Sequence, residues 1–483
     1  MTVLPNKLRV VTENSYGHFS SLGVYIDAGS RYESARMSGV SHMLDRMAFK
    51  STESCSAAEM SSAVDSLGGQ IVCSSSRESM MYQSSHFNSA TPLAMSLMAD
   101  TVRRPLYLSE EVNMQRDAAA YEIREINTKP EMILPEILHQ VAYQSNTIGN
   151  PLLCPEDRLA HIDGNLLREF SQTWFRPDRI VIAGAGLSHE ELVELADKHF
   201  GDLKAPPALE PSQAAKNVLP HLLSPTHIPS PSLYKSLTTA ATAFLSPKPI
   251  AEPSFSTLAS AKARYTGGHL FLHRPDEEFN HVYIAFEGFP INNDDIYTLA
   301  TIQMLLGGGG SFSAGGPGKG MYSRLYTHVL NHHAQIDHCS AFHHIYSDTS
   351  LFGIVGTSYP SMGPDGLVPI MIHQLALLAH GDIPAPELSR AKNQLMSSLV
   401  MALESRAVEV EDLGRQVLVH GRKISVQEMC AKVEKVSAAD VRRVADEVFG
   451  TAARTQPTVL IMGREDAPDW KRSFRQYGVG RDE

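Results

Sequence analysis

The chain has 483 residues, which is too long for one compact core, so two or more domains are expected. Hydrophobic residues make up 43% and charged residues 20%, close to the globular average, which excludes wholesale disorder. The 42 Lys and Arg against 53 Asp and Glu leave a net charge of −11, which disfavours nucleic-acid binding and suits a basic ligand.

The ends of the chain and its cysteines bear on its compartment. No run of 18 or more apolar residues occurs, so direct insertion into a membrane is not expected. The five scattered cysteines form no C-x-x-C pair, which indicates reduced thiols. Residues 1–11 read as a strand, without the features of a signal or transit peptide. We expect either a cytosolic protein or one whose targeting segment has been removed.

The first half of the chain alternates strand-like and helical segments. Residues 22–28 are interpreted as a strand, and residues 70–75 and 80–87 as two hairpin-like strands. Residues 109–127 have the periodicity and charge of a long surface helix, and residues 179–184 form an apolar strand that ends in glycine.

The same order of elements returns in the second half. Residues 281–287 look like a second copy of the strand 22–28, residues 385–404 form another long charged helix, and residues 459–463 form another apolar strand ending in glycine. We interpret this order as an internal duplication. Mixed strands and helices with hairpin-like strands favour an α+β fold over a parallel doubly wound sheet.

A composition change separates the halves. Residues 205–253 are dense in Pro, Ser and Ala without sustained periodicity, which is typical of a linker or insertion. The sequence therefore predicts an N-terminal α+β half at 1–204, a linker at 205–263 and a C-terminal α+β half at 264–483. Each half is expected to be a mainly antiparallel sheet packed with helices, structurally related to the other.

Residues 40–49 carry the pattern of an amphipathic helix, whose buried stripe would be Val40, Met43, Leu44, Met47 and Ala48. The opposite stripe holds His42, Asp45 and Arg46, where an inverted zincin motif, H-x-x-E-H, has two zinc-binding histidines and a general-base glutamate. Arg46 offers only donors and a permanent positive charge, so it repels a metal ion. Asp45 is one methylene shorter than glutamate, so it falls short as a base. Taken alone, this stripe is read more simply as a solvated helix face.

The surrounding sequence carries a more specific signal. Residues 39–52, GVSHMLDRMAFKST, resemble the metal-site helix of mitochondrial processing peptidase subunits, in the inverted-zincin-like M16 family, and the Asp-Arg variant is similar to that of the alpha subunits. Residues 149–155, 263–268 and, above all, 307–321 (GGGGSFSAGGPGKGM) extend the resemblance over nearly the whole chain. The Pro-rich insertion is the main exception.

The resemblance implies a role for each polar position of the helix. Glu122 follows Arg46 by 76 residues, a spacing similar to that of the family's third metal ligand. The predicted degenerate metal-site positions are therefore His42, Asp45, Arg46 and Glu122. In this family the beta subunit binds zinc and the alpha subunit does not, so we expect no catalytic residue, no metal and no cofactor in this chain.

The resemblance also implies partners and a location. The family forms a heterodimer in the mitochondrial matrix, and its substrates are N-terminal presequences, typically basic and amphipathic. We therefore expect a catalytic beta subunit as the partner and basic presequence peptides as ligands, with no nucleic acid. A matrix protein of this family begins after its targeting segment has been removed, and we favour that interpretation of the N-terminus.

The glycine-rich segment 307–320 is the strongest candidate for contact with a peptide. Glycine lacks Cβ and permits positive φ, so another backbone can approach closely. A phosphate-binding loop is disfavoured because Ser313 and Gly320 stand where its pattern needs Gly and Ser or Thr. A flexible linker between helices is the bland alternative. The predicted substrate-binding residues here are Gly307, Gly308, Gly309, Gly310, Ser311, Phe312, Ser313, Gly315, Gly316, Gly318, Lys319 and Gly320.

Two further groups of polar residues invite a functional reading. Glu404, Glu411 and Asp412, after the second long helix, are candidates for charge-assisted bonds to presequence arginines, although a solvated helix end is an equal alternative. Six histidines suggest a second metal site only weakly, and we interpret them as surface or interface residues: His328, His332, His333, His338, His343 and His344.

Three hypotheses follow. The first is a non-catalytic, substrate-recognising subunit of a presequence-cleaving zinc endopeptidase, whose glycine-rich loop passes the presequence to the beta subunit. The second is a core structural subunit of the respiratory bc1 complex, which shares this architecture and needs no active site. The third is an active peptidase rebuilt around His42 and Glu122, but two ligands are too few for tight zinc binding.

Overall fold

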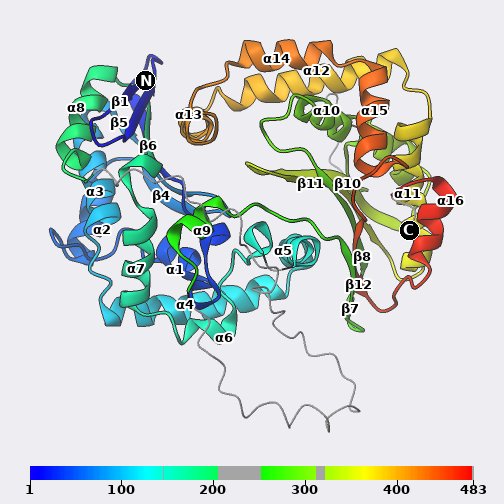
Figure 1. Ribbon diagram of the computed structural model, residues 1–483, viewed down its shortest axis with the longest axis horizontal. Helices are drawn as coiled ribbons and strands as arrows, with labels where there is room; N and C mark the ends of the chain where they lie inside the picture. Colours follow the sequence, from blue (N-terminus) through cyan, green and yellow to red (C-terminus); the bar gives the residue numbers. More distant parts are fainter. Residues whose placement is uncertain (145, 205–251, 312–320, 481–483) are drawn as a thin grey trace, which may run out of the picture.

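The structure, a computed structural model, describes residues 1–144, 146–204, 252–311 and 321–480, and every structural statement below concerns these residues. Two halves lie side by side, each built on one six-stranded mixed sheet packed with helices (Figure 1). The predicted fold class, α+β with two related halves, is therefore confirmed. Most of the predicted linker, residues 205–251, lies outside the described residues.

The sheet of the first half has one parallel pair among otherwise antiparallel strands. The parallel pair is β2 with β6. All residues of β6 are buried, because helices cover both faces, and this explains its continuous apolar sequence. The strand order is β1 (Thr2–Val3), β2 (Arg9–Glu13), β6 (Ile180–Ala185), β3 (Phe19–Ile26), β5 (Met80–Phe87) and β4 (Gln70–Ser75).

The helices of the first half begin at recognisable caps. The Ser56 side chain accepts the amide hydrogen of Glu59 in a capping box that starts α2, and the Ser188 side chain accepts the amide hydrogen of Glu191 at the start of α8. The predicted helix 40–49 is shorter than expected, because Phe49 has a left-handed φ of 57°. The helices are α1 (Val40–Arg46), α2 (Ala57–Ser66), α3 (Thr91–Arg103), α4 (Ser109–Asn127), α5 (Pro130–Tyr143), α6 (Glu156–Leu159), α7 (Gly164–Trp174) and α8 (His189–Phe200).

The second half repeats this plan. Its sheet order is β7 (Gly268–His273), β12 (Thr458–Gly463), β8 (Asn280–Gly288), β11 (Ser350–Ser358), β10 (Ile336–Ile345) and β9 (Gly308–Gly310), with β7 and β12 in parallel. After α9 (Phe255–Ser260), which packs on the first half, its helices are α10 (Ile296–Leu306), a π-helix (Leu325–Leu330), α11 (Pro364–His380), α12 (Ala385–Ala402), α13 (Arg406–His420), α14 (Val426–Lys435), α15 (Ala438–Phe449) and α16 (Trp470–Tyr477). The short α9, within the predicted linker, places the Phe255 ring 4.8 Å from that of Trp174 in the first half.

The halves exchange one helix each. Helix α13 reaches from the second half onto the first sheet, and α5 reaches from the first half onto the second (Figure 1). In α13, Val410, Leu413 and Val417 pack in one cluster with Val11, Tyr25, Met81, Val181, Ala183 and Ala185. In α5, Leu134, Leu138, Ala142 and Tyr143 pack with Tyr283, Ala285, Leu351, Leu460 and Met462. One face of each sheet is thus completed by the other half.

A buried arginine also joins the halves. The Arg31 guanidinium, 6% exposed, donates to Glu78 Oε1 at 2.6 Å within the first half. It also donates to both oxygens of Asp348 in the second half, at 2.8 and 2.5 Å. Burial lowers the pKa of Arg31, but the bond to Asp348 and the charges of both carboxylates outweigh it and raise that pKa. Arg31 therefore stays charged between two carboxylates.

No single helix in the described ranges is long and apolar enough to cross a membrane. Helices α11 and α12 would pass that test of length and composition only if taken together, and they are bent at 104° to each other.

Candidate functional site

Helix α1 is held in place at its N-terminus by a buried carboxylate. Glu33 accepts the backbone amide hydrogens of Gly39 and Ser41, each at 2.7 Å, and the Ser41 hydroxyl at 2.6 Å. Burial raises the pKa of Glu33 to about 7, against these hydrogen bonds. Gly39 has a φ of 88°, and a Cβ there would lie 2.3 Å from Cys154 Sγ. The position of His42 is therefore set by contacts before and beside the helix.

Three of the four predicted positions converge. His42 Nε2 lies 3.3 Å from Glu122 Oε2 of α4, and the Arg46 guanidinium is ion-paired to the same oxygen. Because α1 crosses α4, the 76-residue separation becomes a direct contact. A permanent cation therefore neutralises the Glu122 carboxylate.

The hydrogen bonds of His42 also fix its tautomer. The Cys154 backbone amide donates to Nδ1 at 3.2 Å, so a neutral ring carries its proton on Nε2. That proton faces the Glu122 carboxylate, and the Nε2 lone pair is not available to a metal ion. Burial lowers the pKa of His42 most, and the Arg46 charge lowers it further. The Glu122 charge raises this pKa but does not outweigh burial, so the ring is neutral near pH 7.

Asp45 does not join this group. Its Oδ2 accepts the backbone amide hydrogen of Ser75, at the end of β4, at 2.7 Å. Burial raises the pKa of Asp45, although the hydrogen bond from Ser75 lowers it. Asp45 therefore ties α1 to the edge strand β4. Across the described parts of the chain, no three His, Cys, Asp or Glu side chains are grouped so that they could hold a metal ion.

The glycine-rich segment begins in ordered structure. Gly307 ends α10 with a φ of 56°, and Gly308–Gly310 form the edge strand β9, which pairs antiparallel with β10. The Ser311 amide donates to the Asp337 carbonyl at 2.6 Å, and the Tyr326 hydroxyl donates to the Gly310 carbonyl at 3.3 Å. The predicted residues Phe312, Ser313, Gly315, Gly316, Gly318, Lys319 and Gly320 lie outside the described residues.

Replacing Gly308 by alanine is expected to lower the free energy of unfolding by about 1–3 kcal/mol and to detach β9. Its φ is 98°, and a Cβ would lie 2.0 Å from the Cys339 carbonyl oxygen. Gly310→Ala is the matched control, because a Cβ there meets nothing within 4 Å. Thermal unfolding and amide exchange of β10 measure the difference. Equal behaviour of both variants would show that β9 needs no glycine at position 308.

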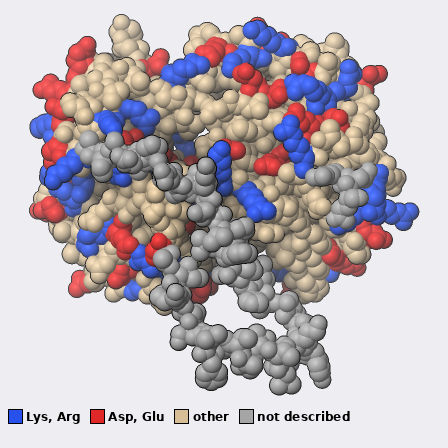
Figure 2. All heavy atoms as spheres, viewed as in Figure 1, with Lys and Arg blue, Asp and Glu red and all other residues tan. Residues whose placement is uncertain are grey.

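The three predicted carboxylates near the α12–α13 corner differ in their surroundings. Glu404 is exposed, and its side chain has no hydrogen bond or ion pair with any described residue. Glu411 is paired with Arg415 at 2.8 Å, and Asp412 accepts two bonds from Gln416 at 2.9 Å. Burial and the nearby Glu411 and Glu13 charges raise the pKa of Asp412, against Gln416 and Lys423. Charged residues of both signs are interspersed over the face in Figure 2, so the acid excess does not form one broad patch there.

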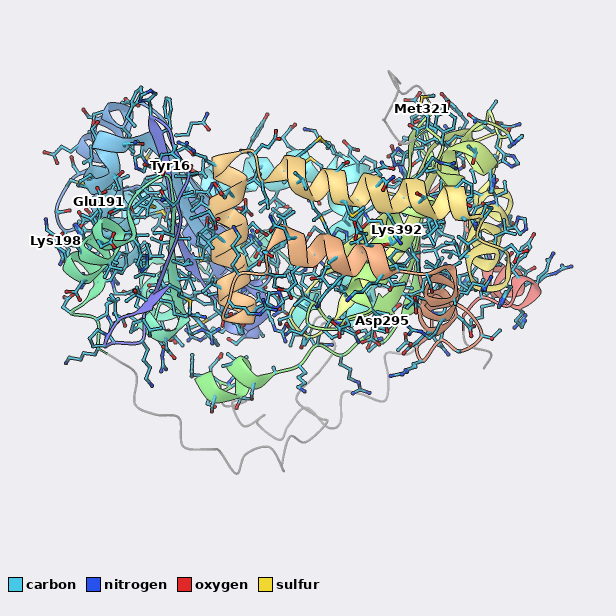
Figure 3. The ribbon with its side chains drawn as sticks, turned by 90° about the horizontal axis from the view of Figure 1, so that it is seen from above. Tyr16, Glu191, Lys198, Asp295, Met321 and Lys392 are labelled. Carbon is cyan, nitrogen blue, oxygen red and sulfur yellow. The ribbon has the colours of Figure 1, made fainter. Side chains whose placement is uncertain are left out.

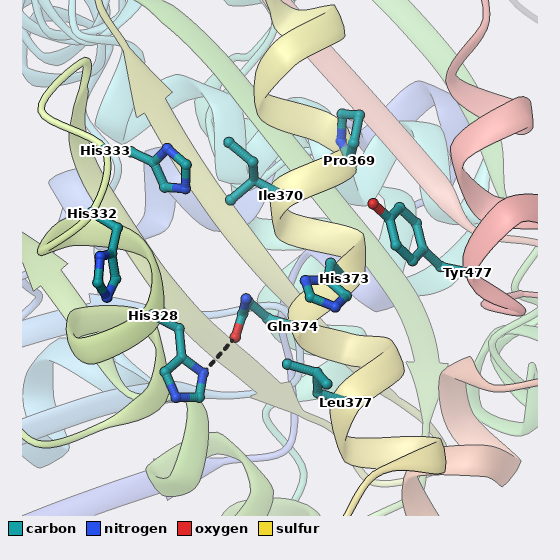
Figure 4. A pocket seen from close by; sticks show the side chains of 9 residues that line it. All are labelled: His328, His332, His333, Pro369, Ile370, His373, Gln374, Leu377 and Tyr477. Carbon is teal, nitrogen blue, oxygen red and sulfur yellow. Dashed lines mark hydrogen bonds between the residues drawn. The ribbon is translucent and has the colours of Figure 1, made fainter.

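The six histidines divide into two groups. His338, His343 and His344 lie on β10. The other three, His328, His332 and His333, line a pocket of about 350 Å³ with His373, between the π-helix, α11 and α16 (Figure 4). His328 Nδ1 is 3.1 Å from Gln374 Oε1. Their rings point in different directions in Figure 4, in agreement with the absence of a metal-ligand group among the described residues.

Sequence reasoning missed the residues that support the site. Glu33, Ser75 and Cys154 position α1 from three separate segments, and none belongs to a recognisable motif. The only sequence feature that pointed to Glu33 was its place shortly before a helix that begins after a glycine, Gly39. The partners of Asp45 and His42 depend on tertiary packing alone.

Comparisons with known proteins identify the family of the chain. Residues 9–156 match the family model described as insulinase (peptidase family M16), and residues 161–395 match the one described as peptidase M16 inactive domain. The chain is 46% identical to the mitochondrial-processing peptidase subunit alpha of Neurospora crassa, over 95% of this chain and 86% of the relative. It is 39% identical to the probable alpha subunit of Schizosaccharomyces pombe and 34% identical to the human alpha subunit, each over 96% of this chain and over 85% and 81% of those relatives.

Proposed function

Since this chain belongs to the M16 peptidase family, among the mitochondrial-processing peptidase alpha subunits, we propose that it is the non-catalytic, substrate-recognising subunit of a heterodimeric zinc endopeptidase. Its partner would be a catalytic beta subunit, its substrates basic N-terminal presequences, and its location the mitochondrial matrix. The observation that carries the proposal is the Arg46–Glu122 ion pair beside His42.

The residues at the family's metal position do not fit a zinc ion. Arg46 places a permanent cation against the Glu122 carboxylate. His42 holds its proton on Nε2, and Asp45 is bonded to Ser75 rather than aimed at a bound water. We therefore assign no metal, no cofactor and no catalytic residue to this chain, and we assign zinc and catalysis to the beta subunit.

The glycine-rich segment suits contact with an extended peptide. Its first residues form β9 at the open edge of the second sheet, anchored through Ser311 and Tyr326. An edge strand without side chains lets another backbone approach closely. We propose that residues 307–320 bind the presequence and pass it to the beta subunit, and that Glu404, Glu411 and Asp412 attract its arginines.

The test compares presequence cleavage by this chain alone, by a catalytic beta subunit alone and by the mixture, with zinc measured in each. Activity only in the mixture and zinc only in the beta subunit are expected. Activity or stoichiometric zinc in this chain alone would overturn the proposal.

Replacing the glycines at 315, 316, 318 and 320 by alanine keeps β9 and tests the loop. Unchanged processing by that variant would favour a structural role, as in a bc1 core subunit.

The double change Asp45→Glu with Arg46→His is expected to destabilise the chain by about 1–2 kcal/mol without restoring zinc. It removes the ion pair with Glu122 and disturbs the bond from Ser75, while the Cys154 amide still holds His42 in the same tautomer. Urea unfolding and metal analysis of the dialysed protein measure both effects. The single variant Arg46→His serves as the control for loss of the ion pair alone. Stoichiometric zinc in the double variant would show that the tautomer argument is wrong.

A further inference from the structure

Large apolar side chains are exposed where the two halves meet. They come from the loop and strand ends of the first sheet and from the α12–α13 corner, and we call them the seam patch: Tyr16, Phe19, Phe87, Val400, Met401 and Val408. Tyr16 is 93% exposed and Met401 61%. Phe19 and Phe87 are nearly half exposed although their rings stack at 4.5 Å. Grouped exposed apolar side chains of this kind mark interaction sites.

Specific bonds hold the two parts of the seam patch together. The Arg406 guanidinium, at the start of α13, donates to the backbone carbonyls of Tyr16 and Phe19. Gly17 leaves room for that guanidinium, since a Cβ there would overlap it. Figure 3 shows Tyr16 beside the corner where α12 meets α13. The patch is therefore a fixed surface that spans both halves.

Carboxylates border the seam patch, and their charge is incompletely balanced. Glu404 lies within the α12–α13 corner, and its side chain is without a partner among the described residues. Glu13 is paired with Lys423 at 2.8 Å. Burial and the Glu13 charge raise the pKa of Glu409, although Lys423 and Arg406 lower it. The charge of Arg406 is directed to backbone carbonyls, so added cations would be favoured here.

We propose that the seam patch binds the apolar face of a basic amphipathic presequence, whose cationic side chains meet Glu404 and Glu409. This inference rests on the proposed function, because it names where the substrate docks. An apolar surface bordered by carboxylates is complementary to a helix with leucines on one face and arginines on the other. The contact is separate from the glycine-rich segment, so a presequence has a second anchor on this chain.

The size of the patch favours a peptide over the partner subunit. A stable subunit interface buries about 800 Å² on each side, with roughly 20–30 residues. The seam patch offers six apolar side chains, a number on the scale of the contacts that one face of an amphipathic helix makes.

The experiment measures binding of a fluorescein-labelled amphipathic peptide of about 20 residues, with leucines on one face and arginines on the other, by anisotropy. The double variant Phe19→Ser with Phe87→Ser is expected to weaken binding about tenfold, and Met401→Ser several-fold. Met114→Ser is the matched control, because Met114 is also an exposed methionine, 67% against 61%, but lies on α4. Circular dichroism confirms that each variant is folded.

Peptide variants identify which contact is lost. A peptide with its leucines replaced by serine should bind weakly and should not distinguish the Phe19 and Phe87 double variant from the unaltered chain. Binding of a peptide with its arginines replaced by glutamine should be unaffected by Glu404→Gln.

Unchanged binding of the original peptide by the seam variants would overturn this inference and leave the proposed function standing. Loss of beta-subunit assembly with unchanged peptide binding would instead make the patch a subunit interface. If neither this chain nor its heterodimer binds presequence peptides, the proposed function itself fails.

Discussion

Replacing Arg31 by methionine is expected to lower the free energy of unfolding by about 3 kcal/mol at pH 7. The side chain is buried, and its loss leaves Glu78 and Asp348 facing each other without a cation. Their side chains are 20% and 19% exposed, so water screens little of that repulsion. The midpoint of urea unfolding measures the effect. A midpoint unchanged from that of the unaltered chain would show that the halves do not depend on this arginine.

The same arginine gives the stability a specific pH dependence. Burial raises the pKa of Asp348, but the bonds from Arg31 and from the Ala263 amide outweigh it and lower that pKa below its usual value. A lowered carboxyl pKa contributes stability above about pH 4, which is lost as the pH falls through the folded-state pKa. The difference in the free energy of unfolding between the Arg31→Met variant and the unaltered chain should therefore become smaller as the pH falls below 4. The double variant Asp348→Asn with Arg31→Met should lose less free energy of unfolding than Arg31→Met alone.

Separate expression of residues 1–204 and 252–483 is expected to give two fragments that do not fold alone but form a one-to-one complex when expressed together. The first fragment lacks α13 and leaves Tyr25, Val181 and their neighbours in water, and the second lacks α5. Exposing such a sheet face removes about 2 kcal/mol for each large side chain that was fully buried. Gel filtration of each fragment and of the co-expressed pair measures the outcome.

A pair of variants makes the fragment test specific to the exchanged helices. Leu413 of α13 is 1% exposed in its cluster, so Leu413→Asp in the second fragment should abolish the complex. Leu413→Met keeps the volume of the side chain and should preserve the complex. A first fragment that is monomeric and cooperatively folded without α13 would show that the helix exchange is dispensable.

Much of the fold could be predicted because periodicity is local information. The helix 109–127 was found with its observed bounds, and the strands 70–75 and 80–87 likewise. The strand 22–28 was placed within a few residues, at Phe19–Ile26. The exchange of α5 and α13 could not be predicted, because an amphipathic pattern shows that a helix buries one face but not which sheet receives it.

The candidate site was predictable where spacing on a helix decides the geometry. His42 and Arg46 are one helical turn apart, and the resemblance supplied Glu122, so their convergence was expected. The orientation of Asp45 and the tautomer of His42 are set by the Ser75 and Cys154 amides, which lie 30 and 112 residues away in the sequence. No local pattern contains that information.

The helix exchange also fixes when the first half can finish folding during synthesis. Arg9 donates a hydrogen bond to the Val417 carbonyl across 408 residues, at 2.9 Å, so the first sheet lacks its covering helix until nearly the whole chain has left the ribosome. Contacts so distant in sequence slow folding, and an uncovered apolar sheet face promotes aggregation while it waits. The nascent chain therefore has a long interval in which a chaperone that shields this face would raise the yield of folded protein.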